Sequence, residues 1–315
     1  MLGVSRLIYG TMGLGGPWNE TKVSDEAAEK AELAFEAAIE AGITFFDFAD
    51  IYSKGKSEKV FGQVVKNRPD IREKVKIQSK AGIILPDSEG INQFDFSAGH
   101  LVKTVEKSLK NLGVDALDSL LLHRPDPLMN AKDLKEACDH LFENHMIAQL
   151  GVSNMNQYQI QFIEKAVGRT IKANQMEISL LKLDWVNSTI GVNNDEGHQS
   201  TMTDGLMEYM MMNDIEIQAW SPMARGWFSG KDLGKNPDEN ILNTRDYVNR
   251  LAKDKNTTPE AIVLAFILKH PAKIRPVIGT TNPERIKASA ESEKTRLSRK
   301  EWYKLYILSR GKRLP

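Results

Sequence analysis

The stretch Phe45-Phe46-Asp47-Phe48-Ala49-Asp50-Ile51-Tyr52 decides how the rest of this chain is interpreted. It continues an apolar run from Ile43, with the length and β-rich composition of a buried strand. Asp47 stands where the run ends, and Tyr52 follows five residues later, before a break at Ser53-Lys54-Gly55. A buried carboxylate is costly unless it is paired or lies in a functional site. The partner of Asp47 must therefore come from elsewhere in the chain.

Outside this stretch, short apolar runs alternate with helical patterns along the whole chain. Ser24, Thr258-Pro259, Asn282-Pro283 and the pair Ser298 and Glu301 mark helix starts, and a polar loop is expected over Asn187–Ser200. We expect about eight strands, namely one near Leu7 and then Ile43–Asp47, Val75–Lys80, Leu117–His123, Ile147–Gly151, Ile171–Asn174, Ile215–Trp220 and Arg275–Ile278.

This alternation fits either a (β/α)₈ barrel or a doubly wound sheet. In a barrel all βα loops meet at one face, so polar residues should recur after every strand, whereas a doubly wound sheet concentrates them at one switch point. They do recur, as Asp47, Lys80, His123, Ser153-Asn154, Gln175, Ser221 and Gly279-Thr280. We therefore predict an α/β fold, a (β/α)₈ TIM barrel, as a single domain over residues 1–315, since no Pro/Gly/Ser-rich linker divides the chain.

Composition narrows the class of protein. Lys and Arg together number 42, as do Asp and Glu, so the net charge is zero and gives no indication of a nucleic-acid or membrane-surface partner. No apolar run is long enough to span a bilayer, and the N-terminus lacks the layout of a signal peptide. A single cysteine, Cys138, excludes an internal disulfide. We expect a soluble cytoplasmic protein with a small-molecule partner. A monomer is compatible with the sequence, which does not define the oligomeric state.

A glycine-rich stretch, Gly10-Thr11-Met12-Gly13-Leu14-Gly15-Gly16, follows the first strand. It has two readings, a dinucleotide-binding fingerprint or a plain strand-end loop. The GxGxxG spacing fails, and the next helix begins only after Ser24, whereas the fingerprint runs directly into a helix. The loop reading is therefore favoured.

Four polar residues at neighbouring strand ends form the candidate site. Alone, Lys80 has a second, less favoured reading as the first solvated residue past a strand, and a lone His123 is more often structural. Together with Asp47 and Tyr52 their chemistry is complementary. The ammonium of Lys80 would favour tyrosinate and so make the phenol of Tyr52 a better proton donor. The carboxylate of Asp47 would keep that ammonium charged and fixed in direction. A neutral imidazole can donate a hydrogen bond to an oxygen that gains negative charge. The set suits carbonyl reduction and lacks an activated nucleophile, so the hydride must come from a cofactor.

A metal site is not expected. The remaining histidines lie in predicted helices or loops and show no ligand spacing; they are His100, His140, His145, His198 and His270.

With these residues in place, the chain resembles the aldo-keto reductases over nearly its whole length. Residues 45–62 resemble the aspartate–tyrosine signature of that family, Leu117–Asp126 its histidine signature, and Leu150–Asn154 the segment that binds the nicotinamide carboxamide. The resemblance implies a catalytic tetrad of Asp47, Tyr52, Lys80 and His123, with Tyr52 as the general acid.

The resemblance also implies a cofactor site. Ser153, Asn154 and Gln175 match residues that hold the carboxamide, and Trp220 matches an aromatic ring that stacks on the nicotinamide. Without the resemblance, Trp220 reads equally as a core tryptophan. The remaining expected cofactor contacts are Met12 after the first strand, Ser221, Met223, Arg225 and Gly226 in a pyrophosphate-binding loop, and Gly279, Thr280, Thr281 and Arg285.

The segment Gly279–Arg285 supports a phosphate site independently of the resemblance. Small hydroxylated residues precede a helix N-terminus there, an arrangement that binds anions after the last strands of barrels. The sequence departs from the family pattern in two places. Gly279 stands where lysine is common, and Ala288-Ser289 stand where a Glu-Asn pair usually contacts adenine. We expect NADPH as the cofactor, with a modest preference over NADH.

We therefore predict an NADPH-dependent reductase of aldehydes or ketones. One alternative is a cofactor-binding regulatory subunit with weak or no turnover, like the barrel β-subunits of potassium channels. Another is a non-redox barrel enzyme, which would leave Ser153-Asn154 and Arg285 without a role.

The substrate is expected to be shaped by loops, since loops are where family members differ. Trp18, Trp185 and Trp227 in those loops indicate an apolar pocket, although each could equally be packing. The loops are Gly16–Lys22, Arg124–Asn130, Met176–Ser200 and Trp227–Asn243.

Overall fold

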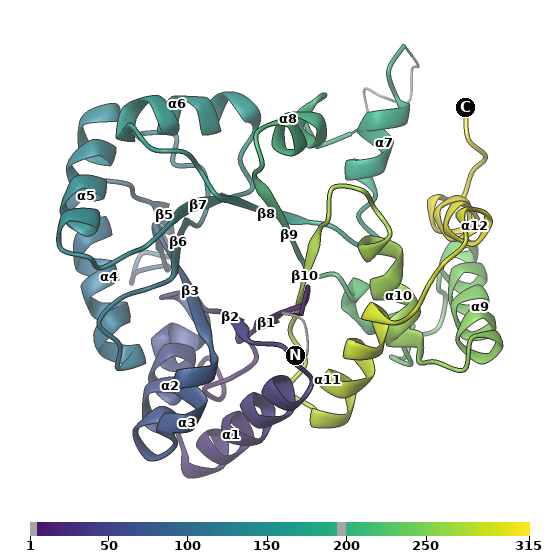
Figure 1. Cartoon of the computed structure of the whole chain (residues 1–315), viewed down its shortest axis with the longest axis horizontal. Coiled ribbons are helices and arrows are strands. Elements are labelled where there is room, and N and C mark those ends of the chain that lie inside the picture. The colour runs from purple at the N-terminus through teal and green to yellow at the C-terminus, as the bar shows by residue number, and fades with distance from the viewer. Residues whose placement is uncertain (1–4, 194–199) are drawn as a thin grey trace.

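In a computed structural model that describes residues 5–193 and 200–315, parallel strands close into one barrel surrounded by helices (Figure 1). The strand order around the barrel is β1-β10-β9-β8-β7-β6-β3-β2. The predicted (β/α)₈ barrel is therefore confirmed. The barrel strands are β1 (Ile8–Gly10), β2 (Phe45–Asp47), β3 (Lys76–Ala81), β6 (Ser119–Leu122), β7 (Leu150–Ser153), β8 (Ala173–Glu177), β9 (Glu216–Trp220) and β10 (Arg275–Ile278).

Helices cover the outside of the barrel, as the view down its axis shows (Figure 1). They are α1 (Asp25–Glu40), α2 (Lys56–Asn67), α3 (Pro69–Lys74), α4 (Ala98–Leu112), α5 (Ala131–Glu143), α6 (Gln157–Val167), α7 (Asp184–Ile190), α8 (Leu206–Met212), α9 (Glu239–Asp254), α10 (Pro259–Leu268), α11 (Pro283–Ala290) and α12 (Arg299–Arg310), with short 3₁₀ turns η1 (Tyr52–Gly55), η3 (Ala224–Gly226) and η4 (Glu291–Glu293). None of these helices combines the length and apolar character that crossing a bilayer requires.

The helix starts agree with the predicted caps. The side chains of Ser24, Thr258 and Asn282 each accept a hydrogen bond from the first turn of the helix that follows. Ser298 and Glu301 form the reciprocal capping box at α12. At Ser24 and Asn282 the capped helix follows a barrel strand, β1 and β10 respectively, so these caps limit the length of the loop at the carboxyl end of that strand.

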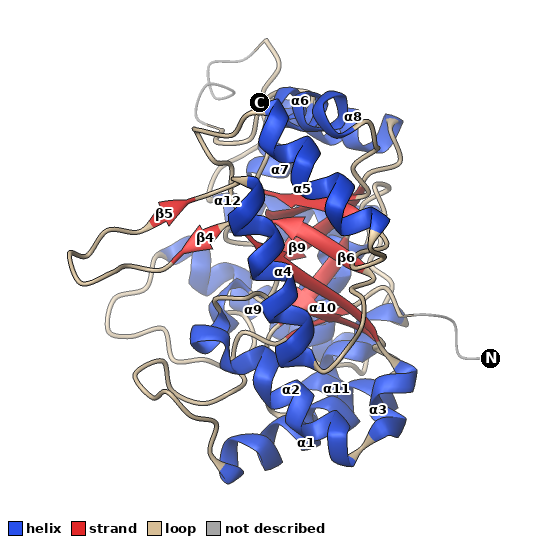
Figure 2. Cartoon of the chain, turned by 90° about the vertical axis from the view of Figure 1, so that its left-hand side faces the viewer, coloured by secondary structure: helices blue, strands red, loops and turns tan. Residues whose placement is uncertain are grey.

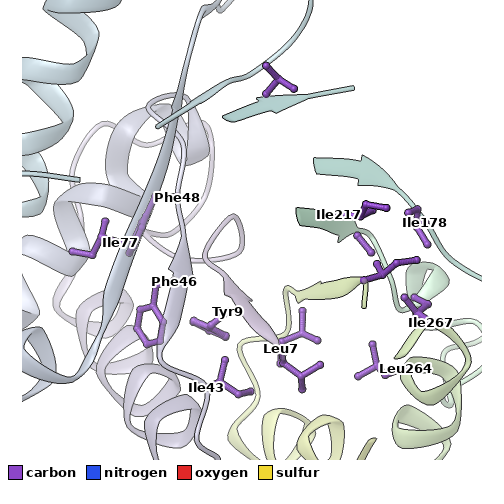
Figure 3. Close-up of a cluster of buried hydrophobic side chains, with 14 of the residues drawn as sticks. Leu7, Tyr9, Ile43, Phe46, Phe48, Ile77, Ile178, Ile217, Leu264 and Ile267 are labelled. Atoms are coloured by element: carbon purple, nitrogen blue, oxygen red, sulfur yellow. The ribbon is translucent and has the colours of Figure 1, made fainter. Parts of the chain in front are cut away.

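The alternation of side chains along β2 separates the packed core from the site. Phe46 is fully buried against Tyr9, Phe35 and Phe61, with ring centroids 5.3–6.3 Å apart. Figure 3 shows Phe46 and Tyr9 within the apolar cluster between strands and helices. Because successive side chains of a strand point to opposite faces, Asp47 points into the barrel instead. One strand therefore contributes to both the core and the site.

Two features outside the regular alternation were not predicted. The antiparallel hairpin of β4 (Ile83–Ile84) and β5 (Gln93–Phe94) follows β3 and projects from the barrel (Figure 2). Its strands have two residues each, too short to leave a periodic pattern. Helix α7 occupies the first part of the expected polar loop Asn187–Ser200, so that expectation is wrong there, while residues 194–199 lie outside the described chain.

Candidate active site

The four candidate residues lie at or just after the carboxyl ends of three adjacent strands of the barrel. Asp47 ends β2, Lys80 lies near the end of β3, and His123 directly follows β6. The registers Asp47↔Gln78 and Lys80↔Leu121 bring these strand ends to one level. Tyr52 begins η1, the short turn that returns the chain from β2 to α2.

Lys80 is the centre of this group. Its Nζ donates to Asp47 Oδ2 at 2.7 Å, to the carbonyl oxygen of Phe48 at 2.9 Å and to Tyr52 Oη at 3.0 Å. Burial lowers the pKa of Lys80, but Asp47 and Tyr52 outweigh burial and raise the pKa above its ordinary value. Lys80 is therefore a charged ammonium whose three donors are all in use.

Tyr52 is a protonated phenol in this environment. Burial is the largest effect and raises the pKa of its hydroxyl above the ordinary value, and Asp47 raises it further. Lys80 and Arg124 act in the opposite direction without reversing the outcome. We expected Lys80 to favour tyrosinate; it does act in that direction, but the loss of solvation is larger.

His123 is a neutral imidazole. Burial, together with the charges of Lys80 and Arg124, lowers the pKa of His123 well below its ordinary value. Its Nδ1 is buried without a hydrogen-bond partner in the described chain, and its ring lies 6.1 Å from that of Tyr52 in a T-shaped arrangement. A buried donor without an acceptor is rarer than an acceptor without a donor. The proton therefore belongs on Nε2, where it can be donated to a ligand.

The second oxygen of Asp47 is held by amides from inside the barrel. Oδ1 accepts from Gln78 Nε2 at 2.7 Å and from Gln175 Nε2 at 3.1 Å. Both amide groups also donate to Gln218 Oε1, and Gln218 Nε2 donates back to Gln78 Oε1 and on to Glu216. Gln78 and Gln218 were missed in the sequence, where each is one polar residue inside a strand and not at its end. Only the barrel register brings them together.

A cavity of about 710 Å³ opens above these residues. Lys80 and Thr281 do not line it, although Lys80 contacts the lining residues Asp47 and Tyr52. The expected residues that do line it are Met12, Asp47, Tyr52, His123, Ser153, Asn154, Gln175, Trp220, Ser221, Met223, Arg225, Gly226, Gly279, Thr280 and Arg285. A second cavity, of about 920 Å³, lies near residues that precede β1, β2 and β10, at the opposite end of the barrel, and contains none of these residues.

Amide and hydroxyl groups line one wall of the cavity. Ser153 Oγ donates to the backbone oxygen of Gln175 at 2.9 Å, Asn154 Nδ2 donates to Ser153 Oγ at 2.7 Å, and Trp220 Nε1 donates to Asn154 Oδ1 at 3.1 Å. Asn154, Ser221 and Arg225 all have positive φ, at 56°, 53° and 59°. Left-handed backbone costs roughly 1–2 kcal/mol for each non-glycine residue, and such outliers are concentrated at ligand sites.

The far end of the cavity differs from the expected anion site. Asn282 caps α11 by accepting from the backbone N–H groups of Glu284 and Arg285, and Thr280 Oγ1 accepts from Asn282 N. These N–H groups are therefore already satisfied. Arg285 is also engaged, because its Nε donates to Glu260 at 3.1 Å and its Nη2 donates to Ser229 Oγ at 2.9 Å. The ion pair with Glu260 was not predicted.

The near end of the cavity is more apolar. Trp18, Ile51 and Ile83 line it together with the ring of Trp220. Of the other two tryptophans proposed for the substrate pocket, Trp185 is fully buried against Phe266 and does not line the cavity, so that proposal is wrong. Trp227 packs at the edge of the hydrophobic core and also lies outside the lining.

Comparisons with known proteins give matches over nearly the whole chain. The sequence model of the Aldo/keto reductase family matches residues 6–309. A 6-dehydroglucose reductase of Agrobacterium fabrum (strain C58) is 33% identical over 316 residues, covering 99% of this chain and 96% of that protein. A putative voltage-gated potassium channel subunit beta of Schizosaccharomyces pombe is 24% identical over 313 residues, covering 90% of this chain and 85% of that protein.

The fold also matches a solved structure. The glycerol dehydrogenase AKR11B4 from Gluconobacter oxydans superposes with a TM-score of 0.79 at 19% sequence identity, covering 97% of this chain and 91% of that one. At this identity the match supports the barrel architecture alone.

Proposed function

Because this chain belongs to the aldo/keto reductase family and is an oxidoreductase, we propose that it reduces an aldehyde or ketone to the alcohol, with NADPH as the hydride donor and Tyr52 as the proton donor. The observation that carries the proposal is the position of Tyr52. Its hydroxyl lies 3.0 Å from the ammonium of Lys80 and faces the same cavity as His123 and Trp220.

In the proposed reaction the substrate carbonyl oxygen lies between Tyr52 Oη and His123 Nε2. Bound NADPH supplies the hydride to the carbonyl carbon. The carbonyl oxygen then gains negative charge, which the neutral imidazole of His123 stabilises by hydrogen bonding. Tyr52 transfers its proton to that oxygen, and the bond between Oη and hydrogen breaks as the alcohol O–H forms. The phenolate that remains is stabilised by the ammonium of Lys80 until solvent returns a proton.

Asp47 supports this transfer without contacting the substrate in the proposal. Its carboxylate holds the ammonium of Lys80 in place from below, and Gln78 and Gln175 in turn hold the carboxylate. Removing the charge of Lys80 would leave the phenolate in a buried site without a compensating charge, which raises the barrier to proton transfer.

In the proposal a nicotinamide dinucleotide lies along the wall and the far end of the cavity. We assign the carboxamide to the amide and hydroxyl groups of Ser153, Asn154 and Gln175, and the nicotinamide ring to the face of Trp220. Arg225 and Arg285 are the cations that line the remaining length of the cavity and suit phosphate groups. NADPH is preferred in the proposal because Arg285 can bind its additional phosphate, although Glu260 competes for the same guanidinium.

A turnover assay tests the proposal. The purified protein is mixed with NADPH or NADH and a panel of aromatic and aliphatic aldehydes, and both cofactor oxidation and alcohol formation are measured. The proposal predicts one alcohol formed for each cofactor oxidised. Cofactor binding without turnover of any aldehyde would instead support the regulatory-subunit reading, which the similarity to the potassium channel subunit keeps open. Absence of cofactor binding would contradict both.

A further inference from the structure

The substrate end of the cavity contains a cation that the proposed reaction does not use. Arg124 directly follows His123 and lines the cavity with Tyr52, Trp18 and Trp220. Its guanidinium carbon lies 5.6 Å from the ring centroid of Trp220, and its side chain is half-buried. The charge of Arg124 also acts on the pKa of both Tyr52 and His123, which places it beside the reacting groups.

The other cations near the reacting groups have partners. Lys80 pairs with Asp47 at 2.7 Å, and Arg285 pairs with Glu260 at 3.1 Å. Arg225 is exposed over the ring of Trp227, at the end of the cavity that we assign to the cofactor. Within the described chain, Arg124 makes no ion pair or side-chain hydrogen bond. It is therefore the one charge at the substrate end that the described part of the protein does not neutralise.

The nearest acid in the sequence does not serve as its partner. Asp126 is buried, and its two oxygens accept from the backbone N–H groups of Leu128 at 2.7 Å and Phe96 at 2.9 Å. These bonds direct the carboxylate toward the loop backbone. The stacking of Arg124 on Trp220 holds the guanidinium in place and leaves its N–H donors free, since a cation over a ring face does not use them.

We propose that Arg124 binds an anionic group of the substrate, so that the site prefers aldehydes or ketones that carry a carboxylate. A guanidinium is suited to this because its planar set of donors matches the two oxygens of a carboxylate. The aliphatic and aromatic lining from Ile51, Ile83 and Trp18 then holds the carbon skeleton between the carboxylate and the carbonyl. The inference rests on the proposed function for the position of the carbonyl.

Two aldehydes of the same shape test the inference. In 4-formylbenzoate and 4-formylbenzamide the ring and aldehyde are the same, and a carboxylate is replaced by a neutral amide of equal size. The ratio of their kcat/KM values is compared between the wild type and Arg124→Met, so that the difference in intrinsic reactivity cancels. We expect this ratio to fall at least about tenfold in Arg124→Met, mainly through KM. Tenfold is the low end of the effect of a charge-assisted hydrogen bond, because solvent partly screens a half-exposed charge.

Two further variants separate charge from packing. Arg124→Lys keeps the charge but not the planar donor set, and should retain part of the preference. Arg169→Met is the matched control, because Arg169 also stacks on an aromatic ring, that of Phe142 at 4.1 Å, but lies outside the cavity. It should leave the ratio unchanged. An unchanged ratio in Arg124→Met would overturn the inference. If kcat/KM falls equally for both aldehydes, the charge of Arg124 serves the chemistry and not the carboxylate.

A binding measurement keeps the inference testable if neither aldehyde is reduced. In that case the proposed function fails, and calorimetric titration with 4-(hydroxymethyl)benzoate and 4-(hydroxymethyl)benzamide decides the role of Arg124 alone. Tighter binding of the carboxylate to the wild type, lost in Arg124→Met, supports anion recognition. Equal binding of the two compounds to the wild type, or no binding of either, overturns it.

Discussion

The ammonium of Lys80 lies 2.7 Å from Oδ2 of Asp47, and the two side chains are only 1% and 2% exposed. Removing two charges from water costs several kcal/mol for each ion, so a pair this deeply buried adds little stability by itself. It is retained here with all three donors of Lys80 used, one of them by Tyr52. The pair therefore holds a positive charge at a fixed position beside the hydroxyl of Tyr52.

Removing the charge of Lys80 should reduce both stability and activity. In Lys80→Met the carboxylate of Asp47 loses its counterion but remains buried, so we expect the free energy of unfolding to fall by about 3–5 kcal/mol. Carbonyl reduction should fall by about 10²-fold or more, because the phenolate left by proton transfer is no longer compensated. Urea unfolding and steady-state rates measure the two effects.

The double variant Asp47→Asn/Lys80→Met separates these effects. A neutral amide in place of the carboxylate removes the unpaired charge, so most of the lost stability should return while the activity stays low. Recovery of turnover together with stability would show that the ammonium serves folding only, and the role assigned to Lys80 would be wrong.

The amide network inside the barrel should be detectable as stability. Gln218→Leu removes the acceptor shared by Gln78 and Gln175. Both amides then keep only Asp47 as an acceptor, and Gln78 Oε1 loses the hydrogen bond from Gln218 Nε2. Because these groups are buried, we expect a loss of about 1–3 kcal/mol in the free energy of unfolding. Gln149→Leu, an exposed glutamine just before β7, is the matched control and should change it by less than about 0.5 kcal/mol. Equal losses of stability in the two variants would mean that the amide network contributes no more to stability than an exposed surface position.

Cofactor preference should depend on Arg285. In Arg285→Ala, the KM for NADPH should rise about tenfold and the KM for NADH only slightly, because only NADPH carries the additional phosphate. The expected change is at the low end because the side chain of Arg285 is 41% exposed. Equal changes for the two cofactors would assign Arg285 a structural role.

Glu260→Gln is the complementary variant for the same end of the cavity. It removes the carboxylate that accepts from Arg285 and leaves the arginine in place. If Glu260 competes with the phosphate, the KM for NADPH should fall while the KM for NADH changes little. A rise in the KM for NADPH would show that Glu260 positions the arginine for binding.

Much of the fold followed from local signals in the sequence. The apolar run with Phe46 and Asp47 was sufficient to place a strand, and the caps at Ser24 and Ser298 were sufficient to place helix starts. The recurrence of polar residues after strands favoured a barrel. The barrel followed because these signals repeat around one closed sheet. The structure brings Asp47, Tyr52, Lys80 and His123 together, as expected from their strand-end positions.

What could not be predicted depends on contacts between distant residues. Gln78 and Gln218 are 140 residues apart and become partners only through the barrel register. The ion pair between Arg285 and Glu260 joins two helices, and although Arg285 was expected to contact phosphate, nothing in the segment of Glu260 marks it as its partner. Trp185 was a candidate for the pocket because it lies in a loop expected to shape the substrate, with packing as the equal alternative, and packing against Phe266 buries it.

The carboxyl group of Asp50 should make stability depend on pH. Burial, with a contribution from Glu58, raises the pKa of Asp50 from 3.8 to about 7, against the opposing effects of Lys107, Lys80 and the backbone N–H of Ile51. Between these values the folded protein keeps a proton that the unfolded chain has lost, so this group makes stability fall as pH rises. At about 1.4 kcal/mol for each pKa unit, the upper limit is about 4 kcal/mol.

Asp50→Asn tests this dependence. The amide resembles the protonated acid, so the variant should gain stability relative to the wild type as the pH rises from about 4 to about 7. Urea unfolding at several pH values measures the gain, and Asp115→Asn at an exposed position is the control. A difference between variant and wild type that does not change with pH would show that Asp50 ionises normally in the folded protein.

The central claim is that Tyr52 donates the proton in carbonyl reduction, and a single-turnover measurement on Tyr52→Phe tests it most directly. The protein is first saturated with NADPH, an aromatic aldehyde is then added, and the rate of cofactor oxidation is compared with that of the wild type. Only the hydroxyl is removed, so NADPH binding should be retained while the rate falls by about 10²-fold or more. A rate close to that of the wild type in the NADPH-bound variant would contradict the account.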